Sequence, residues 1–563
     1  MLCISMILSS FVPELQAAAP DAGTIQRDVE RKTPSVSRPE SPTVIKLPGK
    51  AAVSGNVGAL RFTVRRFVIE GATLISEASL QAELSGLIGK SLTLDELNAG
   101  VVRIMSAYNR AGYIAEAYVP AQEVHDGVVT IRVVEARLGR VFVESKPGSR
   151  LRPDLARGYV TSSQHPGEYI DTRKLERGLR LLQSTPGVSS SAVIRPGTMP
   201  STVDAVLSLD KVPFVRWSVG VDNFGDVSTG ERRVNAGVNL ESPSSNGDRL
   251  SLKALHSGGL NYGRFLYTLP LGTNGLSAGV SASWLGYKLG GDFKALDATG
   301  QSVTAGAFVG KTLVAGQHSS LSGSIGYDYK NFTDDVAQSR TGDKHLQTVS
   351  IGLSGGWRDD FMGGGWTAGS ALITKGVLDL SKVAVVKTLD SQTAGTDGGY
   401  NKANLSFSRE QQLVPDRLSL TASVTGQIAS RNLDSSEKFI LGGPSGVRAY
   451  PMSEGAGDNG MLFTAELRHQ ATNAIQLFGF YDRGFVRQHL HLWQGWQTLD
   501  GEPNTYSLQG IGAGLLLRPF HNLIVRGTVA KRLGSNPLAD AQGHDHDGTK
   551  RNPRFWLEAA FIF

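Results

Sequence analysis

The residues of this sequence best suited to a specific chemical contact are one arginine and one aspartate toward its end. Arg448 lies within 442–451, a stretch too rich in glycine and proline for a helix or an ordinary strand. Such a stretch predicts a loop that presents a single cation near its tip. Asp482 lies in the apolar, strand-like segment 480–484. If the loop folds back into a wide β-barrel, the two side chains form a charge-assisted pair. If it stays outside, Arg448 is an ordinary surface arginine.

The residues from 213 to 563 carry the pattern that such a barrel requires, a repeated two-residue alternation of apolar and polar side chains. It recurs in 216–222, 249–255, 276–284, 418–428, 462–469 and 523–529. At about 10 residues per strand plus turns, about sixteen strands fit. The last strand is the clearest, with Phe555, Leu557, Ala559, Phe561 and Phe563 on one face and Glu558 on the other. The predicted fold class is therefore a transmembrane antiparallel β-barrel.

The composition of the chain agrees with a barrel and excludes several other classes. Hydrophobic residues make up 40% of the 563 residues, mean hydropathy is −0.13, and no apolar run is long enough for a transmembrane helix. The 67 glycines suit many turns and small lumen-facing positions. A net charge of +6 is too modest for a nucleic-acid-binding surface. The single cysteine, Cys3, excludes an internal disulfide.

The first sixty residues are predicted to be an export signal, 1–19, and a plug helix or linker, 20–60. The signal has an apolar core at 2–12 and small residues at 17–19, although no Lys or Arg precedes the core. A frayed cytosolic N-terminus is the alternative. Prolines at 34, 39, 42 and 48 prevent regular structure in the linker. Residues 24–32, before them, are predicted as a short charged helix, with disorder as the alternative.

Two copies of a β-α-α-β-β pattern precede the barrel, at 61–137 and 138–212, and each predicts a small α/β domain. In the first copy, Thr93 and Glu96 have the spacing of a capping box, and Gly112 ends the helix that they begin. A hairpin signal at Asp126 and Gly127 precedes a strand at 128–135. The second copy is looser: helices are predicted at 151–160 and 172–183, and strands at 140–144, 189–195 and 202–209.

Three short motifs suggest other functions, and each is better explained without them. The segment Gly89-Lys90-Ser91 lacks the earlier glycine of a phosphate-binding loop. The acidic and histidine-rich segment 544–548 offers metal ligands, but its neighbours are those of a hydrophilic surface loop between the last two strands. The glycine-alternating run 510–514 is predicted as a barrel strand with a small-residue face. With no hydrolase signature either, no catalytic residue, metal or cofactor is assigned, and the chain is not predicted to be an enzyme.

The loop and strand motifs, in this order and near the C-terminus, resemble those of a known family. They are similar to the Val-Arg-Gly-Tyr loop and the Phe-x-Asp-x-Gly strand of the TpsB transporters, the hemolysin secretion/activation-type outer-membrane barrels of two-partner secretion. The matching residues are Val447, Arg448, Ala449 and Tyr450 in the loop and Phe480, Asp482 and Gly484 in the strand. Ala449 replaces the family's usual glycine. If that position needs a positive φ, alanine costs on the order of 1–2 kcal/mol.

The same resemblance covers the rest of the chain. The two α/β units resemble POTRA domains, residues 24–32 lie where the family has a plug helix, and Phe563 resembles the terminal aromatic that barrels present to their assembly machinery. The implied protein is an outer-membrane transporter with POTRA domains in the periplasm, which recognises an unfolded exoprotein of hemolysin or adhesin type and exports it. Its implied partners are this exoprotein, outer-membrane lipid and the barrel assembly machinery, with no nucleic acid.

Two other functions remain open at this point. An outer-membrane protein assembly factor is the first alternative, although such factors generally carry more than two POTRA domains. A passive diffusion porin is the second, and it needs neither the periplasmic units nor the loop that carries Arg448.

Overall fold

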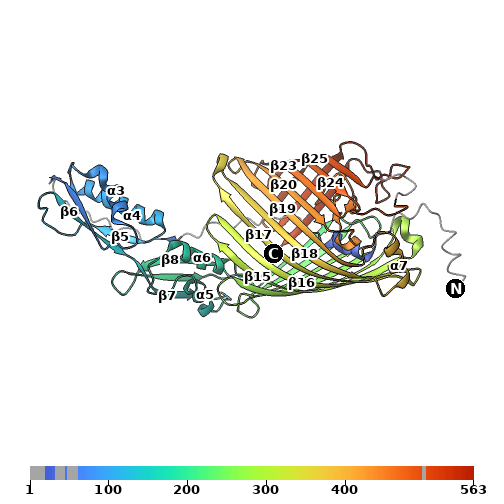
Figure 1. Ribbon diagram of the computed structural model, residues 1–563, viewed down its shortest axis with the longest axis horizontal. Coiled ribbons are helices and arrows are strands. Elements are labelled where there is room, and N and C mark those ends of the chain that lie inside the picture. Colours follow the sequence, from blue (N-terminus) through green and yellow to red (C-terminus); the bar gives the residue numbers. More distant parts are fainter. Residues whose placement is uncertain (1–18, 32–44, 47–60, 497–502) are drawn as a thin grey trace.

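The computed structural model describes residues 19–31, 45–46, 61–496 and 503–563, and it consists of two α/β units followed by a large barrel (Figure 1). The predicted export signal lies outside the described residues, apart from residue 19. In the described part of the chain, the helices are all too short or too polar to cross a membrane.

The first α/β unit has the predicted order of elements. It comprises β2 (Phe62–Thr63), β3 (Arg66–Glu70), α3 (Glu77–Leu84), η2 (Ser85–Leu87), β4 (Ser91–Leu92), α4 (Leu94–Ala111), β5 (Ala115–Tyr118) and β6 (Val128–Glu135). Strand β6 is central, parallel to β3 and antiparallel to β5. The capping box is confirmed: Glu96 N–H donates to Thr93 Oγ1 at 3.2 Å, and Thr93 N–H donates to Glu96 Oε2 at 2.7 Å. Gly112 ends α4 in the left-handed conformation.

The second unit contains β7 (Arg137–Ser145), α5 (Pro153–Thr161), α6 (Thr172–Gln183), β8 (Ser190–Pro196) and β9 (Thr202–Leu209). Its sheet gains a strand that the sequence did not predict, because β1 (Ile45–Lys46) pairs in parallel with Ala192 and Val193 of β8. The expectation of an entirely irregular linker was therefore wrong. Strand β8 is otherwise an edge with unpaired backbone groups, which a short extended segment free of proline can satisfy.

The barrel is a closed antiparallel sheet in which β10 pairs with β27. Its strands are β10 (Val215–Asp222), β11 (Arg233–Glu241), β12 (Arg249–Ser257), β13 (Leu260–Pro270), β14 (Leu276–Lys288), β15 (Thr299–Ala315), β16 (Ser319–Val336), β17 (Ser339–Asp359), β18 (Gly365–Asp379), β19 (Gly398–Val414), β20 (Leu418–Ala429), β23 (Asn459–Gln470), β24 (Ile475–Arg487), β25 (Thr505–Phe520), β26 (Leu523–Arg532) and β27 (Arg554–Ile562). The prediction of about sixteen strands is confirmed over the described residues. Large apolar side chains such as Val280, Ile351 and Ile373 are exposed on the outer face, which is the pattern expected of a transmembrane barrel.

Short elements in the connections include η3 (Gly291–Leu296), η4 (Phe361–Gly363) and α7 (Ala384–Gln392). The connection between β20 and β23 is different, because it folds back into the barrel and contains η5 (Ser435–Glu437), β21 (Phe439–Ile440) and β22 (Ala456–Gly457). Helix α2 (Ala22–Glu30) also lies inside the barrel, packed against η5 and against β14, β15 and β16 (Figure 1). A helix near the predicted 24–32 is thus present, two residues earlier than expected.

Candidate functional site

The tip of the inward-folded connection is a compact loop held by its own backbone. Val447 N–H donates to the Leu441 carbonyl at 2.7 Å, Gly443 N–H donates to the Tyr450 carbonyl at 3.1 Å, and β21 pairs with β22 beneath the tip. Val447, Ala449 and Tyr450 are fully buried against the barrel wall. The glycines and prolines of 442–451 therefore form a tight turn inside the lumen rather than a surface loop.

Arg448 is bound to two strands of the wall through its side chain. Its Nε and Nη2 donate to Oδ2 and Oδ1 of Asp482 on β24, both at 2.8 Å, which is a bidentate pair. Its Nη1 donates to Glu466 Oε2 on β23 at 2.6 Å. The guanidinium also lies over the ring of Phe480, 3.3 Å from the ring centroid.

The backbone of Arg448 is fixed as well. Its N–H donates to Asp482 Oδ2 at 3.1 Å, and its carbonyl accepts from Trp556 Nε1 on β27 at 2.8 Å. Arg448 is 5% exposed and Asp482 is 0% exposed, so the pair that they form is buried. Removing one partner of such a buried pair typically costs about 3–5 kcal/mol because a charge is left uncompensated. The structure thus brings the two motif residues together and adds Glu466 and Trp556 to them.

The remaining motif residues shape the space around the loop. A Cβ on Gly484 would lie 2.5 Å from Leu441 Cδ2, so the glycine lets the hairpin approach β24. Phe480 packs in the same buried cluster as Val447 and Tyr450. Ala449 is not among the described residues with positive φ, so the strain considered for a glycine-to-alanine replacement does not arise. Its Cβ points at Gly510 on β25, where an added Cβ would lie 2.6 Å away.

Helix α2 is held in the lumen by polar contacts, in addition to the apolar packing of Ala22 and Ile25. Asp21 accepts the N-terminal N–H of Thr24 at 2.8 Å and pairs with Lys344 Nζ at 2.7 Å, and Lys344 also pairs with Asp434 at 2.7 Å. Gln26 binds the hydroxyls of Thr304 and Ser302 on β15.

At the other end of the helix, Arg31 donates to carbonyls of the loop that carries Arg448. Its Nη1 donates to Gly442 at 2.7 Å and its Nη2 to Ile440 at 3.0 Å. The helix therefore joins the barrel wall to the loop.

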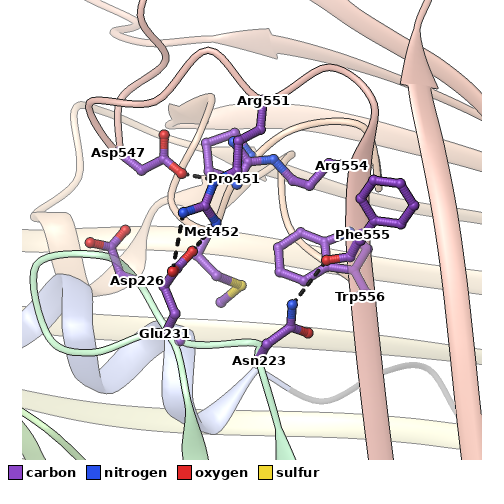
Figure 2. A pocket seen from close by; sticks show the side chains of 11 residues that line it. Asn223, Asp226, Glu231, Pro451, Met452, Asp547, Arg551, Arg554, Phe555 and Trp556 are labelled. Atoms are coloured by element: carbon purple, nitrogen blue, oxygen red, sulfur yellow. Dashed lines mark hydrogen bonds and ion pairs between the residues drawn. The ribbon is translucent and has the colours of Figure 1, made fainter.

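The segment 544–548 lies between the last two strands, as predicted, and His546 and Gly548 are exposed, but its two aspartates are not. Asp545 and Asp547 are buried because they pair with Arg532 and Arg554, and Arg554 Nη1 donates to Asp547 Oδ2 at 2.9 Å. Figure 2 shows Asp547 with Arg554 beside a cavity of about 10 Å³, which has room for a single water molecule. Charge pairing with the two arginines accounts for these carboxylates.

Sequence reasoning missed Glu466, Trp556 and the lumen partners of α2. Glu466 lies on the predicted strand 462–469, and Thr464 two residues before it pairs directly with Asp482. The two acids therefore face the same side of the wall. A lone carboxylate on the lumen face was the available signal, but it becomes useful only once the pairing register is known. Phe563, the predicted assembly signal, stacks on Trp217 with ring centroids 4.0 Å apart.

The fold and the site together define a class of protein, the outer-membrane barrels that move polypeptides. Its features are a closed barrel that follows α/β units and holds an N-terminal helix and an arginine-anchored loop in its lumen. The particular family follows from comparison with known proteins. The family profile described as haemolysin secretion/activation protein ShlB/FhaC/HecB matches residues 202–516, and the ShlB-type POTRA domain profile matches residues 62–136.

The chain therefore belongs to the ShlB/FhaC/HecB family, the TpsB transporters of two-partner secretion, as its motifs indicated. It is an outer-membrane transporter with its POTRA region in the periplasm. It is 25% identical over 577 residues to the heme/hemopexin transporter protein HuxB of Haemophilus influenzae, covering 100% of this chain and 97% of that protein. It is 26% identical over 435 residues to the outer membrane transporter CdiB of Dickeya dadantii, covering 73% of each.

Solved structures show the same fold. CdiB from Escherichia coli superposes with a TM-score of 0.68 at 18% identity, covering 96% of both chains. BamA from Haemophilus ducreyi lacking POTRA domains 1–3 superposes with a TM-score of 0.54 at 14% identity, covering 90% of this chain and 100% of that chain. At these identities the likeness concerns the fold alone, and it gives no support to an assembly function.

Proposed function

We propose that this transporter captures an extended, unfolded exoprotein on its periplasmic sheet edges and passes it through the barrel lumen, which α2 closes at rest. The client would be of the hemolysin or adhesin type. The single observation that carries this proposal is the placement of one N-terminal segment in two positions that a client needs: α2 in the lumen and β1 on the edge of β8. Both must be vacated for transport.

Capture by strand addition is supported by the pairing of β1 with β8. Two residues of the linker already form a parallel ladder with Ala192 and Val193, so this edge accepts an extended chain. Main-chain hydrogen bonds are insensitive to sequence, which suits a client that arrives unfolded. We also assign 61–137 and 138–212 as the two POTRA domains and 213–563 as the barrel. The order of helices and strands and the POTRA match at 62–136 support this division.

Release of α2 is supported by the nature of its contacts. Its bonds to the wall and to the loop involve charged and polar groups such as Lys344, Gln26 and Arg31, all of which water can solvate when the helix leaves. Transport would need no catalysis by this chain, since a client that folds outside cannot return. The outer face would contact outer-membrane lipid, and the terminal strand with Phe563 would be presented to the barrel assembly machinery.

A reversible cross-link tests the path. Replacing Gln26 and Ser302 by cysteine joins α2 to β15 in a chain whose natural cysteine, Cys3, lies in the predicted signal. We expect secretion to fall at least tenfold under oxidising conditions and to return with a reductant. The control joins Val221 to Ala559, which pair directly on neighbouring strands. Wild-type secretion by the fully cross-linked α2 variant would show that the client does not need the lumen.

A further inference from the structure

The barrel is closed by a short seam between its first and last strands. Strand β10 pairs with β27 from Ser218 with Ile562 to Asp222 with Glu558, whereas its other neighbour, β11, pairs along the whole of β10. Residues 554–557 of β27 therefore extend beyond the seam ladder toward the extracellular end. Their backbone groups need other partners on that side.

One side chain supplies them. Asn223 follows the last residue of β10, and its Nδ2 donates to the Phe555 carbonyl at 3.0 Å while its Oδ1 accepts from Leu557 N–H at 2.7 Å. Its own N–H donates to the Leu557 carbonyl at 3.2 Å. The amide thus takes the place of one peptide unit of a neighbouring strand, which Figure 2 shows for the bond to Phe555. An amide is suited to this because it carries both a donor and an acceptor.

The two backbone groups that Asn223 binds flank Trp556. This is the residue whose indole N–H donates to the Arg448 carbonyl at 2.8 Å. Phe224, next to Asn223, meets the Trp556 ring edge to face, with centroids 5.8 Å apart. Beyond Asn223, Glu231 pairs with Arg551, which ties the connection after β10 to the one before β27 (Figure 2). The backbone on either side of Trp556 is therefore held from the β10 side by the Asn223 side chain and a single backbone bond, and not by a continued ladder.

We propose that Asn223 is a positioning residue that fixes β27 around Trp556 and, through the indole, holds the loop that carries Arg448 in the lumen. The inference rests on the proposed function only in giving this loop a role in transport. The contact itself can be tested without a client. Its loss should raise the fraction of time in which the loop detaches from the wall.

The test is the labelling rate of a buried cysteine on the loop. Val447 is 0% exposed, so Val447→Cys in the full-length barrel should react slowly with a small maleimide. Adding Asn223→Ala should raise the rate roughly tenfold, because two hydrogen bonds to β27 are lost. Asn223→Asp keeps the acceptor but not the donor, and it should give an intermediate rate. Asn235→Ala is the matched control, since that amide faces Asp222 and not β27, and it should leave the rate unchanged.

A double mutant distinguishes an effect of Asn223 through Trp556 from a general destabilisation of the barrel seam. If Asn223 acts through Trp556, Asn223→Ala should add nothing to the rate that Trp556→Phe produces alone. Two independent, multiplying effects would overturn the proposal, and so would an unchanged rate in Asn223→Ala. Should the alanine variant fail to fold, the same comparison is made with Asn223→Asp. Loss of secretion is not part of this readout, so a failure of the transport proposal would leave the result interpretable.

Discussion

Two polar assemblies fill the same lumen and are built on different plans. Around Arg448, one planar guanidinium meets a fully buried carboxylate with two parallel bonds, and strands β23, β24 and β27 all contribute partners. Around α2, contacts are spread along a helix: Asp21 at its start pairs with Lys344, Ala22 and Ile25 pack in an apolar cluster with the wall, and Arg31 at its end donates to loop carbonyls. The Arg448 assembly therefore holds one fixed geometry, whereas the contacts of α2 can break one after another.

The difference indicates which part of the lumen contents moves. Separating Arg448 from Asp482 would expose a charge inside protein, a cost that water cannot offset while the loop stays in place. Removing α2 exposes its polar groups to a lumen that water can fill, so hydration offsets part of the lost bonds, each of which contributes about 1–3 kcal/mol net. We therefore expect the loop to stay in place while the helix leaves.

The largest effect is expected when the Arg448–Asp482 pair is removed. Arg448→Ala should reduce secretion about a hundredfold or more while the barrel still reaches the outer membrane, given the roughly 3–5 kcal/mol cost of a broken buried pair. Arg448→Lys keeps the charge but loses the bidentate geometry, and it should be intermediate. Exoprotein in the medium, normalised to folded barrel in the membrane, is the measurement. Normal secretion by both variants would show that the Arg448–Asp482 pair is dispensable.

A steric change beside the loop should have the next largest effect. Gly510→Ala places a Cβ 2.6 Å from that of Ala449 and should destabilise the docked loop by about 1–3 kcal/mol. Adding Ala449→Gly should recover most of the loss. Gly527→Ala on β26 is the control, because an added Cβ there meets nothing within 4 Å. Secretion assays of the three variants decide the matter, and equal defects at positions 510 and 527 would contradict the proposed fit.

A smaller effect is expected at the helix. Arg31→Ala removes the bonds from α2 to the Gly442 and Ile440 carbonyls, and it should raise the open probability of the channel several-fold in planar bilayers. Arg61→Ala, at an exposed arginine of the first α/β unit, is the control and should leave conductance at the parent level. Unchanged conductance in Arg31→Ala would mean that these bonds do not keep the helix in place.

The smallest expected effect concerns a buried carboxylate outside the barrel. Burial would raise the pKa of Glu135, but hydrogen bonds from Thr73, Leu74 and Tyr108 outweigh it and lower the pKa below its ordinary value. Its stabilising contribution, about 1 kcal/mol, is therefore present above the ordinary pKa and is lost as pH falls through the lowered one. Limited proteolysis of the first α/β unit should accelerate in acid. In Glu135→Gln that pH dependence should be weaker, and an identical profile would refute the assignment.

Local rules predicted much of the fold. The capping box of Thr93 and Glu96, the strand at 128–135 and the alternation in 462–469 each depend on neighbours in the sequence, so they could be recognised without a structure. Family resemblance added the roles proposed for Arg448 and Asp482. Neither source predicted β1, because a two-residue strand carries almost no pattern and exists only where β8 offers an edge.

The rest of the site depends on register, which sequence does not determine. Glu466 meets Arg448 because β23 and β24 pair with Thr464 opposite Asp482, and a one-residue slip would point both acids outward. The contact of Ala449 with Gly510 joins the loop to β25. This strand does not pair with β20 or β23, the barrel strands that flank the loop in the sequence. Such a fit is decided by three-dimensional packing, so a glycine-to-alanine change in the loop motif could not be interpreted from the loop alone.

The seam between β10 and β27 also has a consequence for the kinetics of folding. Most neighbouring barrel strands are consecutive in the chain and can pair as hairpins. Ser218 in the first barrel strand, however, must pair with Ile562 in the last one. Such a long loop is slow to close, so this pairing should form last. Until then both edge strands expose unpaired backbone groups that can template aggregation. We therefore expect aggregation during folding to depend on the lifetime of the open sheet, not on the stability of the finished barrel.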